Sequence, residues 1–252
     1  MDLQLKGMNS LITGGSRGIG RAIAEAMAGE GANVAICARG EDGVNAAVEA
    51  LSASGVTAFG QAVDVGDGDA LKAWVEAAAE ALGGIDHIVS NVTGGNGRTE
   101  QDWRANFEHD MLGTVRMVEA AMPHLEKSGN GSILVISTTA AIEAFIGPHS
   151  YNAIKAALLN YSGALAQEAG AKGIRVNAIS PGPIMIEGGA WDNIKKHMTP
   201  FYESTVAAIP VGRMGRAEEI AAQAALLASP LGAYTNGTNI VIDGGFTKRI
   251  QF

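Results

Sequence analysis

The chain has 252 residues, of which 47% are hydrophobic and 17% are charged, and its net charge is −8 at pH 7. So acidic a chain lacks the basic surface that nucleic acids and anionic membranes attract, and its one cysteine, Cys37, excludes an internal disulfide. No signal-peptide pattern begins the sequence, and no apolar run approaches the ~20 residues that span a bilayer. We therefore expect a soluble cytoplasmic protein.

Short apolar segments alternate with longer helical patterns along the whole chain. The predicted strands cover residues 10–13, 33–37, 57–62, 87–90, 132–137, 175–179 and 239–242. The predicted helices cover residues 19–30, 43–53, 70–82, 101–126, 150–171 and 217–228. This alternation predicts an α/β Rossmann fold, with a doubly wound, parallel, seven-stranded sheet and helices on both faces. With no repeat or linker in sight, we expect residues 1–252 to form a single domain.

Glycines follow the first predicted strand in "TGGSRGIGRA". Gly14, Gly18 and Gly20 stand where the strand turns into a helix. Glycines there allow a tight turn and close approach of a pyrophosphate to the helix N-terminus, so the loop predicts a dinucleotide site. The alternative is a turn with crowded packing. No Gly-Lys-Ser/Thr follows, which excludes a nucleoside triphosphate loop.

The end of the second strand, "NVAICARG", indicates which dinucleotide binds. An acid there would bond the ribose 2′-hydroxyl of NAD, but Ala38 and Arg39 occupy this end and Arg17 lies in the glycine loop. Two guanidinium groups suit a 2′-phosphate, so NADP(H) is preferred and NAD(H) stays possible. The alternative is two solvated arginines. Asp64, in "AVDVGD" after the third strand, is either an acceptor for the adenine amine or a helix N-terminal acid.

Tyr151 and Lys155 stand four residues apart in "YNAIK", so they share one face of the predicted helix 150–171. A phenol has an ordinary pKa near ~10, and a sheltered cation nearby lowers it. Taken alone, so short a pattern is better explained as two surface residues of one helix.

Together these motifs resemble the classical branch of the short-chain dehydrogenase/reductase family, which includes 3-oxoacyl-carrier-protein reductases. The matching elements, in order, are Thr13-Gly14-x-x-x-Gly18-x-Gly20, Asn91, a hydroxyl at the end of strand five, Tyr151-x-x-x-Lys155 and Pro181-Gly182. The resemblance implies that Tyr151 is the general acid or base and that Lys155 lowers its pKa and holds the nicotinamide ribose. It implies a cofactor site made of Gly14, Ser16, Arg17, Gly18, Ile19, Gly20, Arg39, Asp64, Val65, Asn91, Tyr151, Lys155, Pro181, Gly182 and Ile184.

The chain departs from the family's pattern in three places. The usual serine thirteen residues before the tyrosine is Thr138, which we prefer over Ser137 because neighbouring strand residues point to opposite faces. The usual asparagine of the fourth helix, which helps to distort that helix, is Asp110, with Asn106 one turn earlier as a weaker substitute. Val92 and Thr93 replace small residues after Asn91. We expect Tyr151, Lys155, Thr138 and Asp110 to form the catalytic group.

A long segment after the sixth strand predicts a substrate lid at about residues 183–215, although its apolar residues could instead belong to the core or to a subunit interface. Its apolar side chains are Ile184, Met185, Ile186, Trp191, Ile194, Met198, Phe201 and Tyr202. They favour an apolar carbonyl or alcohol substrate. The five histidines lack metal-ligand spacing, so we propose no metal site.

We therefore expect an oxidoreductase that transfers a hydride between NADP(H) and a carbonyl or secondary alcohol, as 3-oxoacyl-carrier-protein reductases do. The alternatives are an NAD-dependent alcohol or polyol dehydrogenase, and a dinucleotide-binding sensor or scaffold with weakened chemistry. The resemblance also implies a homotetramer, assembled through the helices near residues 101–126 and 150–171.

Overall fold

The computed structural model describes residues 2–250, and its main sheet has seven strands in the order β3-β2-β1-β4-β5-β6-β9. Every neighbouring pair in this sheet is parallel. The strands are β1 (Asn9–Thr13), β2 (Asn33–Ala38), β3 (Ala58–Ala62), β4 (His87–Ser90), β5 (Ser132–Ile136), β6 (Arg175–Pro181) and β9 (Asn239–Ile242). The predicted α/β fold is confirmed, and each predicted strand matches one of these seven.

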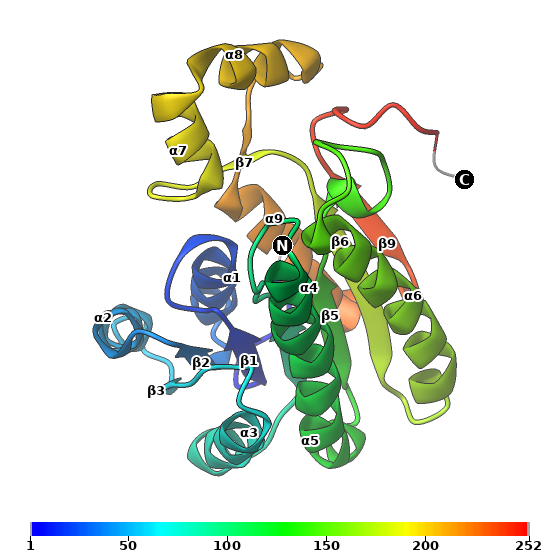
Figure 1. The fold of residues 1–252 in the computed structure, drawn as a ribbon. Coiled ribbons are helices and arrows are strands. Elements are labelled where there is room, and N and C mark those ends of the chain that lie inside the picture. The colour runs from blue at the N-terminus through cyan, green and yellow to red at the C-terminus, as the bar shows by residue number, and fades with distance from the viewer. Residues whose placement is uncertain (1, 251–252) are drawn as a thin grey trace.

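Helices cover both faces of the sheet (Figure 1). On one face α1, α2 and α9 pack in a single apolar cluster, and on the other face α3, α5 and α6 pack in a second. Their bounds are α1 (Gly18–Gly29), α2 (Glu41–Ser52), α3 (Gly68–Leu82), α5 (Gly113–Ser128), α6 (Ser150–Gly170) and α9 (Ala217–Ala228).

The two faces explain why the strands read as nearly continuous apolar runs. In β1, Leu11 belongs to one cluster and its neighbour Ile12 to the other, since successive strand residues point to opposite faces. Every residue of β5 is buried. Burying an aliphatic side chain of this size contributes roughly 1.5–3 kcal/mol, so the sheet is stabilised from both sides.

The predicted single helix over residues 101–126 is wrong in detail, because a π-helical turn interrupts it. The structure has α4 (Glu100–Asn106), a π segment (Phe107–Leu112) and then α5. From the start of α5, the Thr114 hydroxyl donates a hydrogen bond of 2.6 Å to the carbonyl of Asp110 in the π segment. A side chain that takes a helical carbonyl in this way is one recognised cause of a local distortion. The turn buries Asp110 inside the molecule.

The long segment after β6 contains β7 (Ile184–Met185), α7 (Ala190–His197), α8 (Thr199–Ala208) and β8 (Gly215–Arg216). The two short strands pair with each other in parallel. Figure 1 shows α7 and α8 set apart from the main sheet, and α7 has no buried residue. The segment therefore folds as a separate layer beside the sheet. That the chain is one domain with a lid stays a prediction.

The strand order locates the point where a ligand binds in folds of this kind. The chain runs outward from β1 to β3 and then crosses to β4, on the other side of β1. Ligands of doubly wound sheets bind beside the carboxyl ends of the strands at such a reversal. Between residues 2 and 250, no helix combines the length and the apolar character needed to cross a membrane.

Candidate active site

Thr13 and Asn91 join the carboxyl ends of β1 and β4 at the reversal. The Asn91 backbone N–H donates to the Thr13 hydroxyl at 3.0 Å, and its side-chain amide donates to the Thr13 carbonyl at 3.2 Å. The Thr13 hydroxyl in turn donates to the Val89 carbonyl at 3.4 Å. These hydrogen bonds hold the ends of β1 and β4 together directly before the glycine loop.

The glycine loop has no room for larger side chains. Gly14 and Gly18 have φ of +67° and +60°, a region that glycine enters without strain. A Cβ on Gly20 would lie 2.4 Å from the Gly14 carbonyl oxygen and 2.5 Å from the Asn91 side-chain nitrogen. The first turn of α1 receives no side-chain cap from Arg17, so its amide groups are free of a competing side-chain acceptor. Such a helix start suits a pyrophosphate.

Arg17 and Arg39 lie at the loop and after β2, and both are exposed. In the part of the chain that the structure describes, neither forms an ion pair, whereas nearby Arg21 pairs with Glu25 at 2.6 Å. No carboxylate stands at the end of β2, which closes with Ala38. Ser16 and Ile19, the other predicted loop residues, are half-buried. Two uncommitted guanidinium groups are thus available to an anion.

Asp64, predicted to face the adenine, is tied to the π segment. Its Oδ1 accepts a hydrogen bond of 3.0 Å from the Gly66 backbone and lies 3.0 Å from His109 Nε2. The other ring nitrogen of His109 is 2.8 Å from the Ala105 carbonyl. Val65 is buried in the core. Sequence reasoning had assigned His109 no contact in the site.

Residues after β6 return over the glycine loop. The backbone N–H of Gly182, just after β6 ends at Pro181, donates a hydrogen bond of 2.9 Å to the Ile242 carbonyl. Ile184 follows in β7 and is buried. A Cβ on Gly18 would lie 3.2 Å from Cδ1 of Ile186. The segment after β6 therefore contacts the glycine loop directly, and the predicted cofactor residues of both segments share one edge of the sheet.

Tyr151 lies at the start of α6 with its ring partly covered, and Thr138 supplies its hydroxyl neighbour. The Thr138 side chain lies close enough to the phenol to lower the pKa of Tyr151, and its hydroxyl accepts a bond of 3.3 Å from the Ala140 backbone. Ser137 is buried, and its hydroxyl donates a hydrogen bond of 3.1 Å to the Lys155 carbonyl and not to the phenol. The structure thus brings Thr138, and not Ser137, to the phenol of Tyr151.

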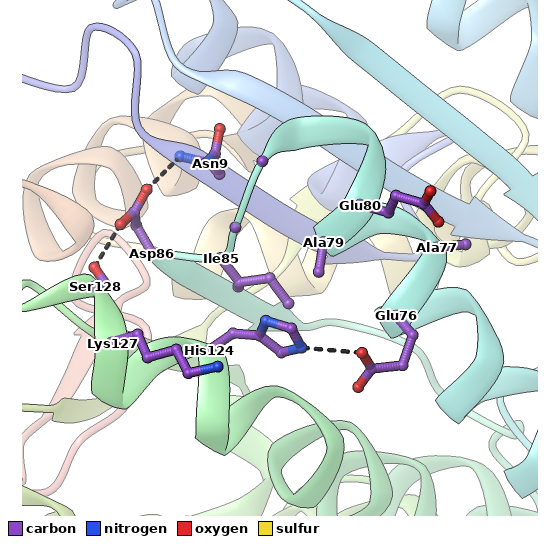
Figure 2. Close-up of a pocket in the computed structure, with 12 residues that line it drawn as sticks. Asn9, Glu76, Ala77, Ala79, Glu80, Ile85, Asp86, His124, Lys127 and Ser128 are labelled. Carbon is purple, nitrogen blue, oxygen red and sulfur yellow. Dashed lines mark hydrogen bonds and ion pairs between the residues drawn. The ribbon is translucent and has the colours of Figure 1, made fainter.

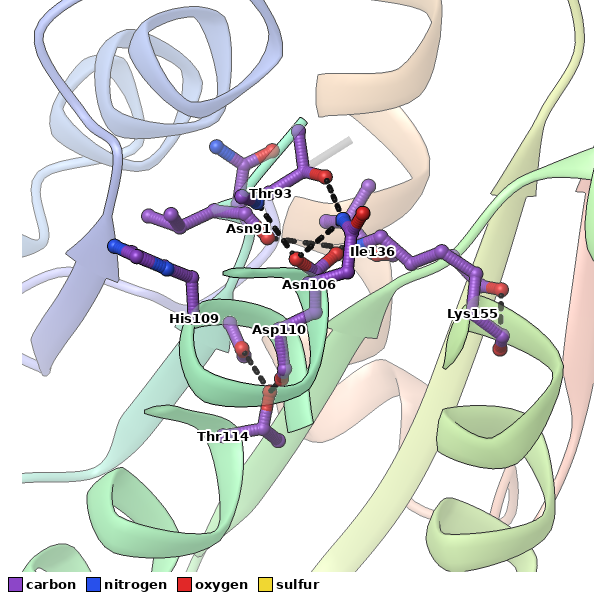
Figure 3. Close-up of polar contacts among 12 residues, drawn as sticks. Asn91, Thr93, Asn106, His109, Asp110, Thr114, Ile136 and Lys155 are labelled. Atoms are coloured by element: carbon purple, nitrogen blue, oxygen red, sulfur yellow. Dashed lines mark hydrogen bonds and ion pairs between the residues drawn. The ribbon is translucent and has the colours of Figure 1, made fainter. Parts of the chain in front are cut away.

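Lys155 is buried, and its ammonium group faces three oxygen atoms (Figure 3). It donates to the Ile136 carbonyl at 2.9 Å and to the Val92 carbonyl at 3.3 Å. The third oxygen, Asp110 Oδ1, lies 3.2 Å away. Within residues 2–250 this oxygen has no aligned hydrogen bond, so the contact with Lys155 is an ion pair. The ammonium also lies 5.9 Å from the centre of the Tyr151 ring.

The ionisation of Tyr151 runs against the expectation from sequence. Loss of contact with water raises the pKa of Tyr151 to about 12, the hydrogen bond with Thr138 lowers it, and the negative charge of Asp110 raises it. A cation beside the phenol was expected to lower this pKa. In the structure the negative charge of Asp110 compensates the positive charge of Lys155, and the same carboxylate opposes the formation of a phenolate at Tyr151.

Asn106 and Asp110 act together one helical turn apart. The side-chain amide of Asn106 donates a hydrogen bond of 3.1 Å to Asp110 Oδ2. The same oxygen accepts a hydrogen bond of 2.7 Å from the Gly94 backbone N–H. The side-chain oxygen of Asn106 accepts a hydrogen bond of 2.7 Å from the hydroxyl of Ser150, which precedes Tyr151. Sequence reasoning rated Asn106 only as a weaker substitute for Asp110. The structure instead places both residues in one buried network that connects α4, the loop after β4 and α6.

Four aromatic rings gather beside the start of α6. Phe145 lies 6.3 Å from Trp191, 6.4 Å from Phe201 and 5.8 Å from Phe246, measured between ring centres. Trp191 and Phe201 stack at 5.9 Å. The loop after β5, the helices α7 and α8, and the C-terminal segment thus meet around Phe145.

A separate hollow of about 720 Å³ lies at the opposite edge of the sheet, between α3 and α5 (Figure 2). Several of its polar groups are paired with one another: Asp86 accepts from the Asn9 backbone at 2.7 Å and from the Ser128 hydroxyl, and His124 lies 3.2 Å from Glu76. These contacts join α3, α5 and the strand ends. Across residues 2–250, no cluster of three or more histidine, cysteine or acidic side chains is arranged to hold a metal ion.

Comparison with known proteins agrees with this geometry. A profile of the family described as Enoyl-(Acyl carrier protein) reductase matches residues 14–247. Isoepoxydon dehydrogenase patN of Penicillium expansum is 41% identical over 257 residues, which cover 98% of each protein. The 3-oxoacyl-[acyl-carrier-protein] reductase FabG of Vibrio cholerae is 32% identical over 248 residues, covering 96% of this chain and 98% of that protein.

A solved structure gives the same result in three dimensions. The L-sorbose reductase from Gluconobacter frateurii, complexed with NADPH and L-sorbose, superposes with a TM-score of 0.91 at 31% identity, covering 99% of this chain and 100% of that one. The chain therefore belongs to the short-chain dehydrogenase/reductase family, as the sequence motifs predicted. It is an NAD(P)-dependent oxidoreductase that acts on an alcohol or a carbonyl group.

Proposed function

We propose that the protein prefers NADP(H) and interconverts a small ketone and its secondary alcohol, with Tyr151 as the proton donor or acceptor. The observation that carries this proposal is the contact of Thr138 with the Tyr151 phenol, on the strand edge that also carries the crowded glycine loop. A phenol and a hydroxyl donor on one side of a carbonyl oxygen are sufficient to polarise and protonate it.

The residues present fit a dinucleotide. Gly14, Gly18 and Gly20 leave space that a Cβ would fill, and α1 starts beside them without a side-chain cap. Arg17 and Arg39 are free to bind a 2′-phosphate, which supports NADP(H) over NAD(H). When bound, the nicotinamide ring supplies or accepts the hydride.

Each remaining site residue has a role that its contacts support. Thr138 would donate a hydrogen bond to the substrate oxygen and orient the phenol. Lys155, held by two carbonyls and Asp110, would bind the cofactor ribose. Asp110 is a positioning residue that fixes the ammonium of Lys155. Asp64 and Val65 would bind the adenine, and Pro181, Gly182 and Ile184 the nicotinamide end.

For the substrate, we propose a small alcohol or ketone that is free in solution. The resemblance to 3-oxoacyl-carrier-protein reductases, such as the one from Vibrio cholerae, supports an acyl chain on a carrier protein instead. The higher identity to isoepoxydon dehydrogenase and the likeness to an L-sorbose reductase favour free small molecules. Trp191 and Phe201 would form the apolar side of a substrate lid over residues 183–215, which faces Phe145 in the loop after β5.

Loss of NADPH absorbance in the presence of candidate substrates tests these proposals. The panel should contain cyclic ketones, ketose sugars and a 3-oxoacyl thioester, each also tried with NADH. We expect turnover of a small ketone with NADPH, and a loss of about 10²–10⁴-fold in Tyr151→Phe with NADPH binding retained. If wild type and Tyr151→Phe are equally inactive on every substrate while NADPH binds, the protein is a sensor or scaffold.

Assembly and location are further proposals. A homotetramer through α4, α5 and α6 is supported by two exposed large apolar side chains, Trp103 of α4 at 38% and Phe107 of the π segment at 48% exposure. Light scattering after size exclusion would measure the mass, and a monomer would contradict this proposal. Cytoplasmic location rests on composition alone.

A further inference from the structure

The loop that precedes Tyr151 contains a strained residue. Ile146 has a φ of +57°, although it is β-branched, and its side chain is 45% exposed. A β-branched residue in the left-handed region is an outlier that persists only where its surroundings hold it. Burial does not hold Ile146, so other contacts must.

Arg98, in the loop after β4, supplies one of these contacts. Its guanidinium donates 2.6 Å to the Ile146 carbonyl and, through Nε, 2.9 Å to His149 Nε2. Asn152 holds the same loop from α6, donating to the carbonyls of Phe145 at 3.0 Å and Gly147 at 3.2 Å. Residues 145–149 are thus fixed from both sides.

The contact between Arg98 and His149 requires an uncharged imidazole. Arginine has only N–H groups to offer, so His149 Nε2 must accept and therefore carries no proton. The other nitrogen, Nδ1, lies 2.8 Å from the Asn96 side-chain oxygen and donates to it. A second proton on His149 would set an N–H against an N–H and break the bond to Arg98.

Residues 145–149 connect the aromatic cluster to the proposed acid. Phe145, next to the strained Ile146, contacts Trp191, Phe201 and Phe246. Two residues after His149, Tyr151 lies in the first turn of α6. A change in the Ile146 backbone would therefore move Phe145, and with it the apolar side of the substrate site.

We propose that Arg98, bound to the uncharged His149, is a positioning residue that fixes residues 145–149 and thereby sets the affinity for substrate. This inference rests on the function proposed above. Arg98 touches neither the cofactor residues nor the catalytic group, so its effect should fall on KM and leave NADPH binding and kcat nearly unchanged.

Steady-state kinetics of Arg98→Ala tests the inference, with Arg104→Ala as the matched control, because Arg104 pairs with Glu100 on the exposed side of α4. We expect KM to rise about tenfold in Arg98→Ala, as for loss of one or two hydrogen bonds, with the NADPH Kd unchanged. Arg104→Ala should match wild type. An unchanged KM in Arg98→Ala overturns the inference, whereas absence of turnover in wild type overturns the proposed function instead.

Two variants of His149 separate positioning from folding. His149→Gln keeps an oxygen that accepts from Arg98, so its KM should stay close to wild type, while His149→Phe should resemble Arg98→Ala. If both variants raise KM equally, the bond to Arg98 is not what matters and the inference fails. This pair decides the question even if Arg98→Ala does not fold.

Discussion

The Asp110 carboxylate lies 3.2 Å from the Lys155 ammonium, and both side chains are buried. Burying two charges is costly unless they are paired, so each holds the other in place. The pairing also neutralises the cation that was expected to favour the phenolate of Tyr151. Asp110 therefore affects the proposed acid in two ways, through its own charge and through Lys155.

Asp110→Asn should make Tyr151 more acidic. The carboxylate raises the pKa of Tyr151, so removing its charge lowers this pKa and leaves Lys155 uncompensated, which acts in the same direction. In alcohol oxidation the phenolate is the base, so activity rises with pH as Tyr151 ionises. The rise of kcat/KM with pH should thus move to lower pH in the variant.

The control for this measurement is Glu108→Gln, which removes another carboxylate of the same π segment. The Glu108 carboxylate pairs with Arg116 and not with Lys155. Its pH profile should match wild type. A profile of Asp110→Asn that coincides with wild type, or moves to higher pH, would contradict the electrostatic role of Asp110.

The two hydroxyls after β5 should differ in effect. Thr138→Val removes the group beside the phenol and should lower kcat by about 10²–10³-fold, as for a missing oxyanion donor, while Thr138→Ser should retain activity. Ser137→Ala loses a buried hydrogen bond to the Lys155 carbonyl and should cost about 1 kcal/mol of stability. Kinetics and urea unfolding of the three variants check this. A larger loss of kcat in Ser137→Ala than in Thr138→Val would reverse the assignment.

Gly20→Ala should weaken cofactor binding, because the new Cβ would lie 2.4 Å from the Gly14 carbonyl and push the loop apart. Gly29→Ala is the control in the same helix, since no atom lies within 4 Å of its added Cβ. That control should bind NADPH normally and gain up to about 1 kcal/mol in stability. Fluorescence titration with NADPH measures the affinity of each variant. Equal affinity in the two variants would contradict a cofactor site at the glycine loop.

The alternation of strands and helices was readable from the sequence because both faces of the sheet are buried. Each buried strand is a run of apolar residues, so its position in the chain can be predicted from the local sequence alone. The π segment was not readable from helical periodicity, since the bond from Thr114 to the Asp110 carbonyl depends on one hydroxyl in a folded context. Only the family resemblance indicated a distortion there.

Within the site, pairs close in sequence were predicted and contacts between distant segments were missed. Tyr151 and Lys155 share a helix face, and the same four-residue spacing could have linked Asn106 to Asp110. The contacts of Asp64 with His109 and of Arg98 with His149 join residues 45 or more positions apart, and no local pattern marks them. The pKa of Tyr151 was misjudged for the same reason, because the burial of its phenol and the nearby charge on Asp110 both arise only in the folded chain.

Arg39→Asp should shift cofactor preference from NADP(H) toward NAD(H). Arg39 is exposed beside the end of β2, where a carboxylate would accept from a ribose 2′-hydroxyl and repel a 2′-phosphate. Because the change removes a charge-assisted hydrogen bond and introduces a repulsion, it should lower the ratio of kcat/KM for NADPH over NADH by about 10²-fold. The control is Arg21→Ala, since Arg21 lies on α1 but pairs with Glu25. If the ratio in Arg39→Asp equals that of Arg21→Ala and wild type, Arg39 does not bind the phosphate, and the preference must rest on Arg17 or be absent.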